Sequence, residues 1–219
     1  MTESDPLTRI LRAEAPEARV AARRFADRAA AEHLADLAYA TEESPLGTLL
    51  LVSGAGGLTR MHYLDDPLEP LLEKLARSRS PRIVESRAAL DPWLRELDEY
   101  FAGRRRRFEA PLDWEQMAPF QRAVLRATAA IPFGETSTYS GVAALAGSPR
   151  AQRAAGNALG ANPLAIIVPC HRVLRTGGGF GGYTGGVERK HFLLVLEGRA
   201  GSPRPPSAAC GDPSGDAAN

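Results

Sequence analysis

The chain has 219 residues, 44% of them hydrophobic and 24% charged, with a formal net charge of +1. This length and composition allow one large or two small domains with a real core. No stretch approaches the ~18 consecutive apolar residues of a membrane span, so we expect no membrane partner. The two distant cysteines form no disulfide framework and no signal peptide is recognisable, which predicts a reducing, cytoplasmic location. The histidines and cysteines lack paired metal-ligand spacing, and we expect neither a metal nor a cofactor.

Charge is distributed unevenly along the chain. Residues 1–110 carry 17 Lys/Arg and 19 Asp/Glu, whereas residues 111–198 carry eight and five. The mildly basic second part is compatible with a nucleic-acid partner but does not establish one.

The first forty residues are rich in alanine, arginine and glutamate. Apolar residues near helical spacing predict one or two helices over residues 6–39, broken near Pro16. We therefore interpret residues 1–42 as an N-terminal helical extension.

A strand hairpin and two helices are predicted next. Residues 46–52 and 58–64 are strand candidates joined by a glycine-rich turn, which lacks the Lys-Ser/Thr of a phosphate loop. Residues 68–77 and 88–101 have helical patterns. The arginine run 104–107 is interpreted as a solvated surface loop in preference to a phosphate-binding cluster.

The second half is dominated by short helices, predicted over residues 120–130, 137–146, 150–159 and 187–196. A short glycine-containing turn joins the middle two, which suggests a helix-turn-helix. The second of this pair is built from small residues and lets its backbone approach a neighbour closely. Tight helix packing and insertion into a DNA groove both fit this feature.

Cys170 is the candidate nucleophile. It lies in the segment 166–173, after a short apolar run and with His171 beside it, and the thiolate is the reactive form of such a residue. The alternative is a buried core thiol. The other cysteine, Cys210, falls in the segment 199–219, whose Pro, Gly, Ser and Ala content predicts disorder.

A glycine-rich loop follows the candidate nucleophile. Seven of the eleven residues in 176–186 are glycine, and Phe180 and Tyr183 are interleaved with them. Such a loop can offer backbone groups to a flat ligand, and its aromatics argue against a flexible linker.

Several motifs stand in an order that is specific as a set. They are Pro119-Phe120-Gln121, Ile131-Pro132-Phe133-Gly134-Glu135-Thr136 with Tyr139, Arg153-Ala154-Ala155-Gly156, Asn162-Pro163, Pro169-Cys170-His171-Arg172-Val173, Gly182-Tyr183-Thr184-Gly185-Gly186 and Glu197-Gly198. This set resembles the O6-alkylguanine-DNA alkyltransferases, strongly over 119–197 and more loosely from 43.

The resemblance implies an α+β (mixed α/β) fold in two domains. A ribonuclease-H-like domain is expected over residues 43–110. A mostly helical, winged-helix-like domain with the helix-turn-helix, which binds DNA and carries out alkyl transfer, is expected over residues 111–198.

The resemblance also implies catalytic roles. Cys170 would accept the alkyl group, and His171 would deprotonate it through a water molecule. Glu197 would hold and polarise the histidine. Asn162 would brace the surrounding loop, and Tyr139 would help rotate the nucleotide out of the duplex.

The remaining implied roles concern DNA and the extruded base. Arg153 would fill the gap in the base stack, on a helix that Ala154 and Gly156 keep small enough for the minor groove. The extruded base would be held by backbone groups of Val173, Tyr183, Thr184 and Gly185.

The implied function is DNA repair. A monomer would flip O6-alkylguanine out of double-stranded DNA and transfer its alkyl group to Cys170 in a single, irreversible turnover, with activity on O4-alkylthymine left open. One alternative is a non-catalytic, alkyltransferase-like damage-binding protein, but those relatives lack the cysteine. Another is a Cys-His hydrolase or a thiol-redox enzyme, although no resolving cysteine lies nearby.

Overall fold

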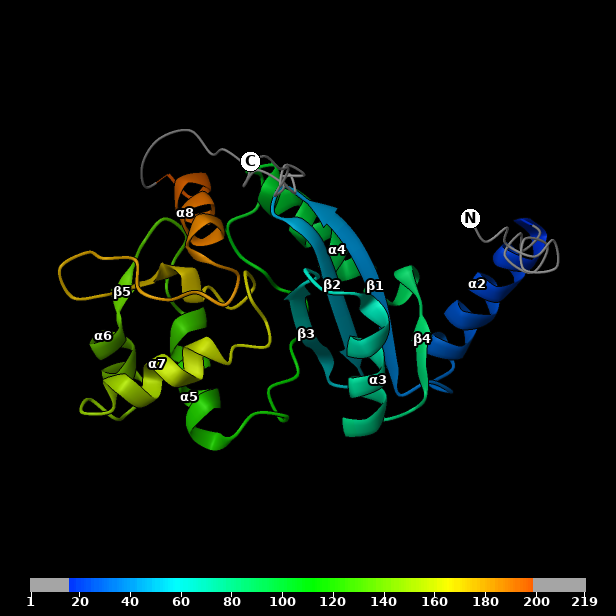
Figure 1. Cartoon of the computed structure of the whole chain (residues 1–219), viewed down its shortest axis with the longest axis horizontal. Helices are drawn as coiled ribbons and strands as arrows, with labels where there is room; N and C mark the ends of the chain where they lie inside the picture. The colour runs from blue at the N-terminus through cyan, green and yellow to red at the C-terminus, as the bar shows by residue number, and fades with distance from the viewer. Residues whose placement is uncertain (1–15, 199–219) are drawn as a thin grey trace, which may run out of the picture. The chain divides into compact units, whose positions relative to one another are not determined.

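The protein divides into two compact units in a computed structural model that describes residues 16–198 (Figure 1). Of the described residues, the first unit contains 16–43 and 47–118, and the second contains 44–46 and 119–198. The predictions for residues 1–15 and for the tail 199–219, Cys210 included, lie outside the described residues. Within the described range, no helix is long and apolar enough to span a membrane.

The first unit is a four-stranded sheet with helices on both faces. The sheet order is β3-β2-β1-β4, in which β2 and β3 form the predicted antiparallel hairpin and β1 pairs in parallel with β4. The elements are α2 (Pro16–Ala31), β1 (Leu37–Ser44), β2 (Gly47–Gly54), β3 (Gly57–Tyr63), α3 (Leu68–Ser78), β4 (Ile83–Glu85) and α4 (Arg87–Phe101).

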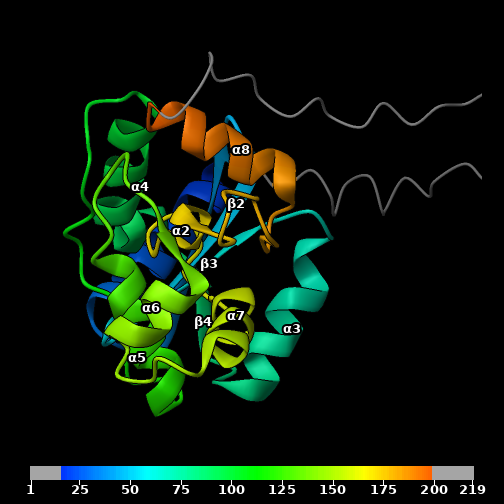
Figure 2. The same ribbon diagram turned by 90° about the vertical axis from the view of Figure 1, so that its left-hand side faces the viewer.

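Strand β2 supplies the centre of this core. Its Leu50 and Val52 are fully buried and pack in one cluster with Leu75 of α3. Because side chains alternate along a strand, Leu49 and Leu51 point to the opposite face, where α4 lies (Figure 2). The sheet is therefore covered by α3 on one face and by α4 on the other.

The predicted helical extension is wrong from Leu37 onward. Helix α2 ends at Ala31, and β1 begins at Leu37 inside the range 1–42 that we assigned to the extension. The alanines of this segment favour a helix in isolation. Burial of Leu37, Ala38 and Ala40 between β2 and β4 outweighs that preference.

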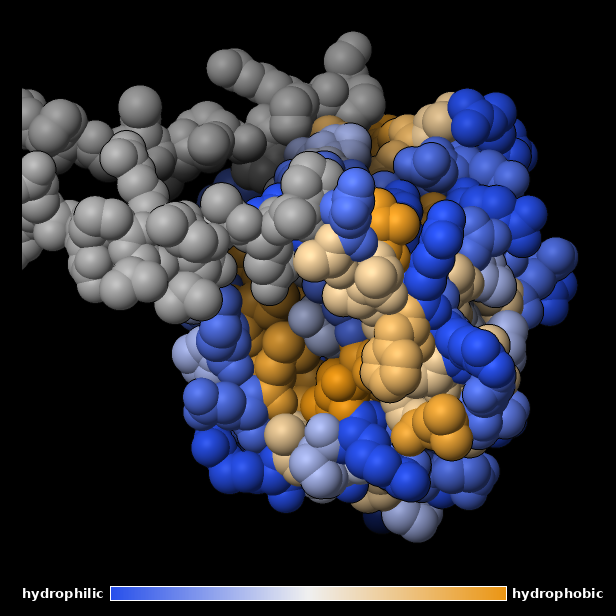
Figure 3. Space-filling model, turned by 90° about the vertical axis from the view of Figure 1, so that its right-hand side faces the viewer, coloured by the Kyte–Doolittle hydropathy of each residue, from blue (hydrophilic) through white to orange (hydrophobic). Residues whose placement is uncertain are grey.

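Helix α2 packs on the first unit through its C-terminal half. Ala29 is buried, and the Ser86 hydroxyl donates a 2.6 Å hydrogen bond to Asp27. The helix contacts β4 and thereby covers that edge of the sheet. Apolar side chains remain exposed along this face of the unit, among them Val20 and Phe25, and Figure 3 shows apolar patches between its hydrophilic residues.

The chain after α4 is fixed to the first unit. Glu96 accepts hydrogen bonds from the backbone amides of Glu109 and Ala110, and Trp93 donates one to the Pro111 carbonyl at 3.0 Å. The compact units consequently divide between residues 118 and 119, whereas we predicted a domain boundary after residue 110.

The second unit is mostly helical, and its helices α5, α6 and α7 pack against one another (Figure 2). Its elements are α5 (Pro119–Ala129), β5 (Ser137–Thr138), α6 (Tyr139–Leu145), α7 (Gln152–Gly160), the 3-10 turn η1 (Cys170–Arg172), β6 (Val173–Leu174) and α8 (Val187–Leu196).

The predicted helix-turn-helix is formed by α6 and α7. Thr138 caps α6, because its side chain accepts a hydrogen bond from the Gly141 amide at 3.1 Å. The two-residue strands β5 and β6 pair in parallel, with Ser137 opposite Val173. This pairing joins the start of the helix-turn-helix to the segment that follows Cys170.

Candidate active site

Two tight turns place Cys170. The Cys170 amide donates to the Val168 carbonyl at 2.8 Å around Pro169, whose φ of −80° and ψ of 63° are those of an inverse γ-turn. Four residues before the cysteine, the buried Ile166 has a φ of 67°. A β-branched residue in this region costs roughly 1–3 kcal/mol and persists only where its surroundings fix it. The strain therefore lies next to the candidate nucleophile.

Asn162 holds these turns together. Its Nδ2 atom donates to the Val168 carbonyl at 2.9 Å and to Cys170 Sγ at 3.2 Å. Its Oδ1 atom accepts from the Leu164 amide at 3.0 Å. One buried amide thus fixes the backbone on both sides of the strained segment and contacts the sulfur atom.

Cys170 is a thiol in the resting protein. Burial raises its pKa above the ordinary 9.0, and the hydrogen bond from Asn162 and the charge of Lys190 offset this only in part. A nucleophilic reaction therefore requires a base that removes the thiol proton.

His171 and Glu197 form a buried acid–base pair. His171 Nε2 lies 2.9 Å from Glu197 Oε1. Burial would raise the pKa of Glu197, but hydrogen bonds from His171 and Arg172 outweigh it and lower the value to about 2. Burial lowers the pKa of His171 more than Glu197 raises it, so the ring is neutral near pH 7.

The ionised carboxylate selects the histidine tautomer. An ionised Glu197 can only accept, so Nε2 of His171 carries the proton and Nδ1 is left as the basic atom. Among the described residues, no group hydrogen-bonds to this buried Nδ1. The histidine therefore presents an unprotonated nitrogen that can accept a proton.

Arg172 completes the buried charge cluster, and our site prediction did not include it. Its Nε and Nη2 atoms donate to the two oxygens of Glu197, each at 2.9 Å, and its Nη1 donates to the Ile131 carbonyl at 2.6 Å. This bidentate pairing fixes the carboxylate plane and keeps Glu197 ionised beside the histidine.

Lys190 is a second buried cation that our site prediction did not include. It is fully buried, and its Nζ atom donates to the carbonyls of Val173, at 2.6 Å, and of Phe180. Burial lowers its pKa to about 8. The lysine ties β6 to the glycine-rich loop and places a positive charge near Cys170.

A cavity of about 350 Å³ opens onto Cys170. It brings together five of the twelve predicted site residues and adds three that we did not predict, Leu159, Gly160 and Gly182. Its walls are formed by Tyr139, Gly156, Leu159, Gly160, Cys170, Gly182, Tyr183 and Thr184.

Tyr139 lies between Gly156 of the cavity wall and Gly181 of the glycine-rich loop. A β-carbon added at Gly156 would lie 3.6 Å from its ring, and one added at Gly181 would lie 2.5 Å from its hydroxyl. Burial raises the pKa of Tyr139, so its hydroxyl remains protonated and can donate a hydrogen bond. The cavity wall thus contains a neutral hydrogen-bond donor as well as Cys170.

The other predicted residues surround the cavity. Arg153 and Ala154 are exposed on α7. The Thr184 hydroxyl donates to the Gly160 carbonyl at 3.1 Å, and the Gly185 carbonyl accepts from Arg189 at 3.4 Å. The Val173 carbonyl, which we expected to hold the extruded base, accepts from Lys190.

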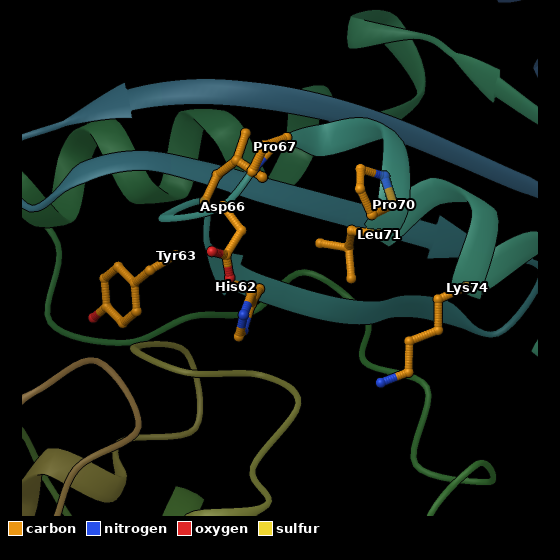
Figure 4. A pocket seen from close by; sticks show the side chains of 8 residues that line it. His62, Tyr63, Asp66, Pro67, Pro70, Leu71 and Lys74 are labelled. Carbon is orange, nitrogen blue, oxygen red and sulfur yellow. The ribbon is translucent and has the colours of Figure 1, made fainter.

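The first unit has a separate cavity of about 410 Å³, shown in Figure 4. His62 and Tyr63 of β3 line it together with Leu71 and Lys74 of α3. It contains no cysteine and none of the predicted site residues. Within residues 16–198 no cluster of His, Cys, Asp and Glu could hold a metal ion.

Two family models cover most of the chain. Residues 37–114 match the ribonuclease-like domain of 6-O-methylguanine DNA methyltransferase, and residues 119–199 match the DNA binding domain of the same family. The chain belongs to the 6-O-methylguanine DNA methyltransferase family.

Named relatives of this family are similar over nearly their whole length. A methylated-DNA–protein-cysteine methyltransferase of Mycolicibacterium paratuberculosis is 41% identical over 74% of this chain and 92% of the relative. The inducible enzyme of Bacillus subtilis is 42% identical over 69% of this chain and 85% of the relative. The ribonuclease-like and helical units place the fold in the family as predicted.

Solved structures of the family agree with the fold. The crystal structure of Mycobacterium tuberculosis OGT in complex with DNA matches with a TM-score of 0.63 and 39% identity, covering 73% of this chain and 92% of that one. An O6-methylguanine-DNA methyltransferase from Pyrococcus kodakaraensis matches with a TM-score of 0.53 and 27% identity, covering 74% of this chain and 99% of that one.

The spacing of residues along α8 contained a signal for site residues that we did not predict. Lys190, Leu193 and Glu197 follow one another at spacings of three and four and share one helix face. Since Leu193 is fully buried, the two charged residues had to be buried with it and to find partners. The partner of Glu197 is Arg172, which follows an otherwise apolar run.

Proposed function

We propose that this protein repairs DNA by transferring the alkyl group of O6-alkylguanine to Cys170. The observation that carries the proposal is the buried arrangement of Cys170, His171 and Glu197 at the base of a cavity, in a chain of the 6-O-methylguanine DNA methyltransferase family. A thiol that must be deprotonated lies next to a neutral histidine whose orientation a carboxylate fixes.

The reaction forms one bond and breaks one. Cys170 loses its proton through a water molecule to Nδ1 of His171, and its sulfur attacks the alkyl carbon. The bond between that carbon and guanine O6 breaks, and the proton is returned to guanine, which is restored. The product is a thioether at Cys170 that no nearby group can cleave, so each molecule reacts once.

Tyr139, Arg153 and α7 would make the base accessible. Flipping a nucleotide out of the duplex costs a few kcal/mol. The exposed Arg153 at the start of a helix of small residues suits insertion into the minor groove, where it would replace the lost stacking. The Tyr139 hydroxyl would donate a hydrogen bond to the base within the cavity, beside backbone groups of Tyr183 to Gly185.

Asn162 and Lys190 support the sulfur chemically. Asn162 donates a 3.2 Å hydrogen bond to Sγ, and such a bond strengthens when the acceptor becomes a thiolate. The nearby ammonium of Lys190 favours the same anion. We propose that both stabilise the charge that develops when His171 takes the proton.

The alternative functions explain fewer of these observations. Alkyltransferase-like damage-binding proteins lack the cysteine, whereas here Cys170 lines the cavity. A thiol-redox enzyme needs a resolving thiol, and Cys170 is the free cysteine among the described residues. We further propose that the protein acts as a monomer in the cytoplasm.

Counting repaired lesions tests the proposal. The protein is mixed with a duplex oligonucleotide carrying O6-methylguanine, in excess over protein, and the restored guanine is measured over time. We expect a rapid rise that stops at about one guanine per protein, and no restoration with Cys170→Ser. Continued turnover, or repair by Cys170→Ser, would refute the single-turnover mechanism.

A further inference from the structure

Phe180 is a large apolar side chain that the proposed mechanism does not use. Its side chain is 39% exposed, and it follows three consecutive glycines in the loop beside the cavity. The chain from Gly182 to Thr184, which begins two residues after Phe180, forms part of the cavity wall. Phe180 therefore lies at the rim of the proposed base-binding cavity.

The loop that carries Phe180 is an ordered turn. The Arg175 amide donates to the Gly179 carbonyl at 2.8 Å, and the Gly178 amide donates to the Arg175 carbonyl at 2.9 Å. Gly177 and Gly178 have φ values of 93° and 89°, which glycine adopts without strain. These bonds close a tight turn and fix the point from which Phe180 projects.

Phe180 itself is held at two points. The buried ammonium of Lys190 binds its carbonyl oxygen, and its ring contacts the His191 ring edge to face at a centroid distance of 5.6 Å. An apolar side chain kept at the surface by a buried charge and a ring contact is oriented for an outside partner.

The charge next to Phe180 indicates the chemistry of that partner. Arg175 at the base of the turn is exposed, and its backbone is bonded to the same turn. An aromatic ring next to a cation is the combination with which proteins bind unstacked nucleic acid, through base stacking and phosphate contact. A nucleotide beside a flipped base has lost a stacking neighbour and offers its face.

We propose that Phe180 stacks on a DNA base next to the nucleotide that enters the cavity. This inference rests on the proposed function, because it takes that base from the DNA substrate of the same site. Phe180 contacts DNA outside the cavity and contributes to the reaction only when the alkylated guanine is part of a strand.

Comparing two substrates tests the inference. Rate constants for alkyl transfer to Cys170 are measured with O6-benzylguanine in a duplex oligonucleotide and as the free base. Phe180→Ala should slow the reaction with DNA by about fivefold to thirtyfold, the lower part of the range for base–aromatic stacking, and leave the free-base rate unchanged. Phe180→Tyr keeps the flat ring and should retain the rate with DNA, whereas Phe180→Leu should not.

Phe25→Ala is the matched control, because Phe25 is a 72% exposed aromatic on α2 in the other unit. It should leave both rates unchanged. An unaltered DNA rate in Phe180→Ala would refute the inference. Equal losses on DNA and on the free base would refute it as well, because they would assign the ring to the cavity structure.

A binding measurement separates this inference from the proposed function. Affinity for an unmodified single-stranded oligonucleotide requires no alkyl transfer, and Phe180→Ala should weaken it by a similar factor. If the wild-type protein binds DNA but transfers nothing, the proposed function fails and this affinity still decides the role of Phe180. Equal affinity of wild type and Phe180→Ala, or no binding by wild type, overturns the inference.

Discussion

Glu197 determines the protonation states of the buried groups in the site. It accepts from His171 on one oxygen and from Arg172 on both, so it remains ionised although it is buried. The consequence for His171 is a neutral ring with its basic nitrogen directed away from the carboxylate. The resting protein therefore pairs a thiol with a ready base, and neither group needs to change its charge before substrate arrives.

The pH dependence of alkyl transfer should reflect this pairing. Burial lowers the pKa of His171 below 6.5 and raises that of Cys170 above 9.0. Between these values the thiol and the neutral histidine coexist, so the rate constant should be level near pH 7, and its acid decline should be centred below pH 6.5. Single-turnover rates with an alkylated oligonucleotide check this. A decline centred at or above pH 6.5 would contradict the neutral buried histidine.

Replacing Glu197 should affect stability as well as reactivity. Glu197→Gln leaves Arg172 buried without its counter-charge, and breaking a buried pair in this way costs about 3–5 kcal/mol of the free energy of unfolding. Urea denaturation measures this loss. Glu188→Gln, at an exposed position on the same helix, is the control and should cost less than about 1 kcal/mol.

The stability of the protein at acidic pH provides a second measurement of the contribution of Glu197. The pKa of Glu197 falls from 4.5 to about 2 on folding, so its ionised form stabilises the folded state above pH 4.5. That contribution is lost as the pH falls from 4.5 toward 2. Glu197→Gln has no such group and should lack this component of the acid loss. Identical acid profiles for the two proteins would contradict the lowered pKa.

Some residues of the site could be predicted from the sequence and others could not. Cys170 and His171 could be predicted because they are adjacent in an apolar run. Glu197 was reached through motif resemblance, and Arg172 and Lys190 were missed as site residues. Their roles depend on bonds to the backbone at Ile131, Val173 and Phe180, and no local pattern encodes such distant acceptors.

At the scale of structural elements, the glycine-rich loop 176–186 shapes the cavity. Gly181 has a φ of 65°, and a β-carbon there would lie 2.5 Å from the Tyr139 hydroxyl. Gly177 has a φ of 93°, but nothing lies within 4 Å of a β-carbon added there. The two positions share a backbone requirement and differ in what they contact.

Alanine substitutions at these two glycines should therefore have different effects. Gly181→Ala should slow alkyl transfer by about ten- to hundredfold, because displacing Tyr139 disturbs the geometry of the cavity. Gly177→Ala carries the same left-handed backbone penalty without the clash and should change the rate much less. Single-turnover kinetics on one alkylated duplex compare them, and equal effects would show that the Tyr139 contact does not matter.

Helices and strands with a strong local sequence pattern were predicted, and those without one were not. The hairpin of β2 and β3 and the helices α3, α5, α6, α7 and α8 lie within a few residues of their predicted ranges. The first three residues of β1, 37–39, fell within the predicted helical segment 6–39, whose alanines favour that state, and burial in the sheet overrides this preference. The strands β4, β5 and β6 are two or three residues long and depend on pairing with distant partners.

At the scale of the whole molecule, the positive charges fall into two groups. Arg172 and Lys190 are buried and bind groups of the protein, and Arg105 in the run 104–107 pairs with Glu96 and Glu99. The arginine run therefore contributes a structural ion pair and is not simply a solvated loop. In the proposed function, exposed arginines of the second unit, Arg153 among them, would contact DNA phosphates and bases.

The salt dependence of DNA binding should distinguish these groups. Each phosphate contact contributes about one unit to the slope of log affinity against log salt. Arg175→Ala, which removes an exposed cation beside the cavity, should reduce the slope by about one. Arg105→Ala, whose side chain is engaged by glutamates, should leave the slope unchanged and lower the stability of the first unit. A reduced slope for Arg105→Ala would contradict its structural assignment.

The most direct test of the account is the location of the transferred group. The protein is incubated with a duplex containing O6-methylguanine, weighed intact and then digested for peptide mapping. We expect a gain of one methyl group per molecule, carried by the peptide that contains Cys170, and no gain for Cys170→Ser. A protein of unchanged mass that still restores guanine, or a methyl group found on another residue, would contradict it.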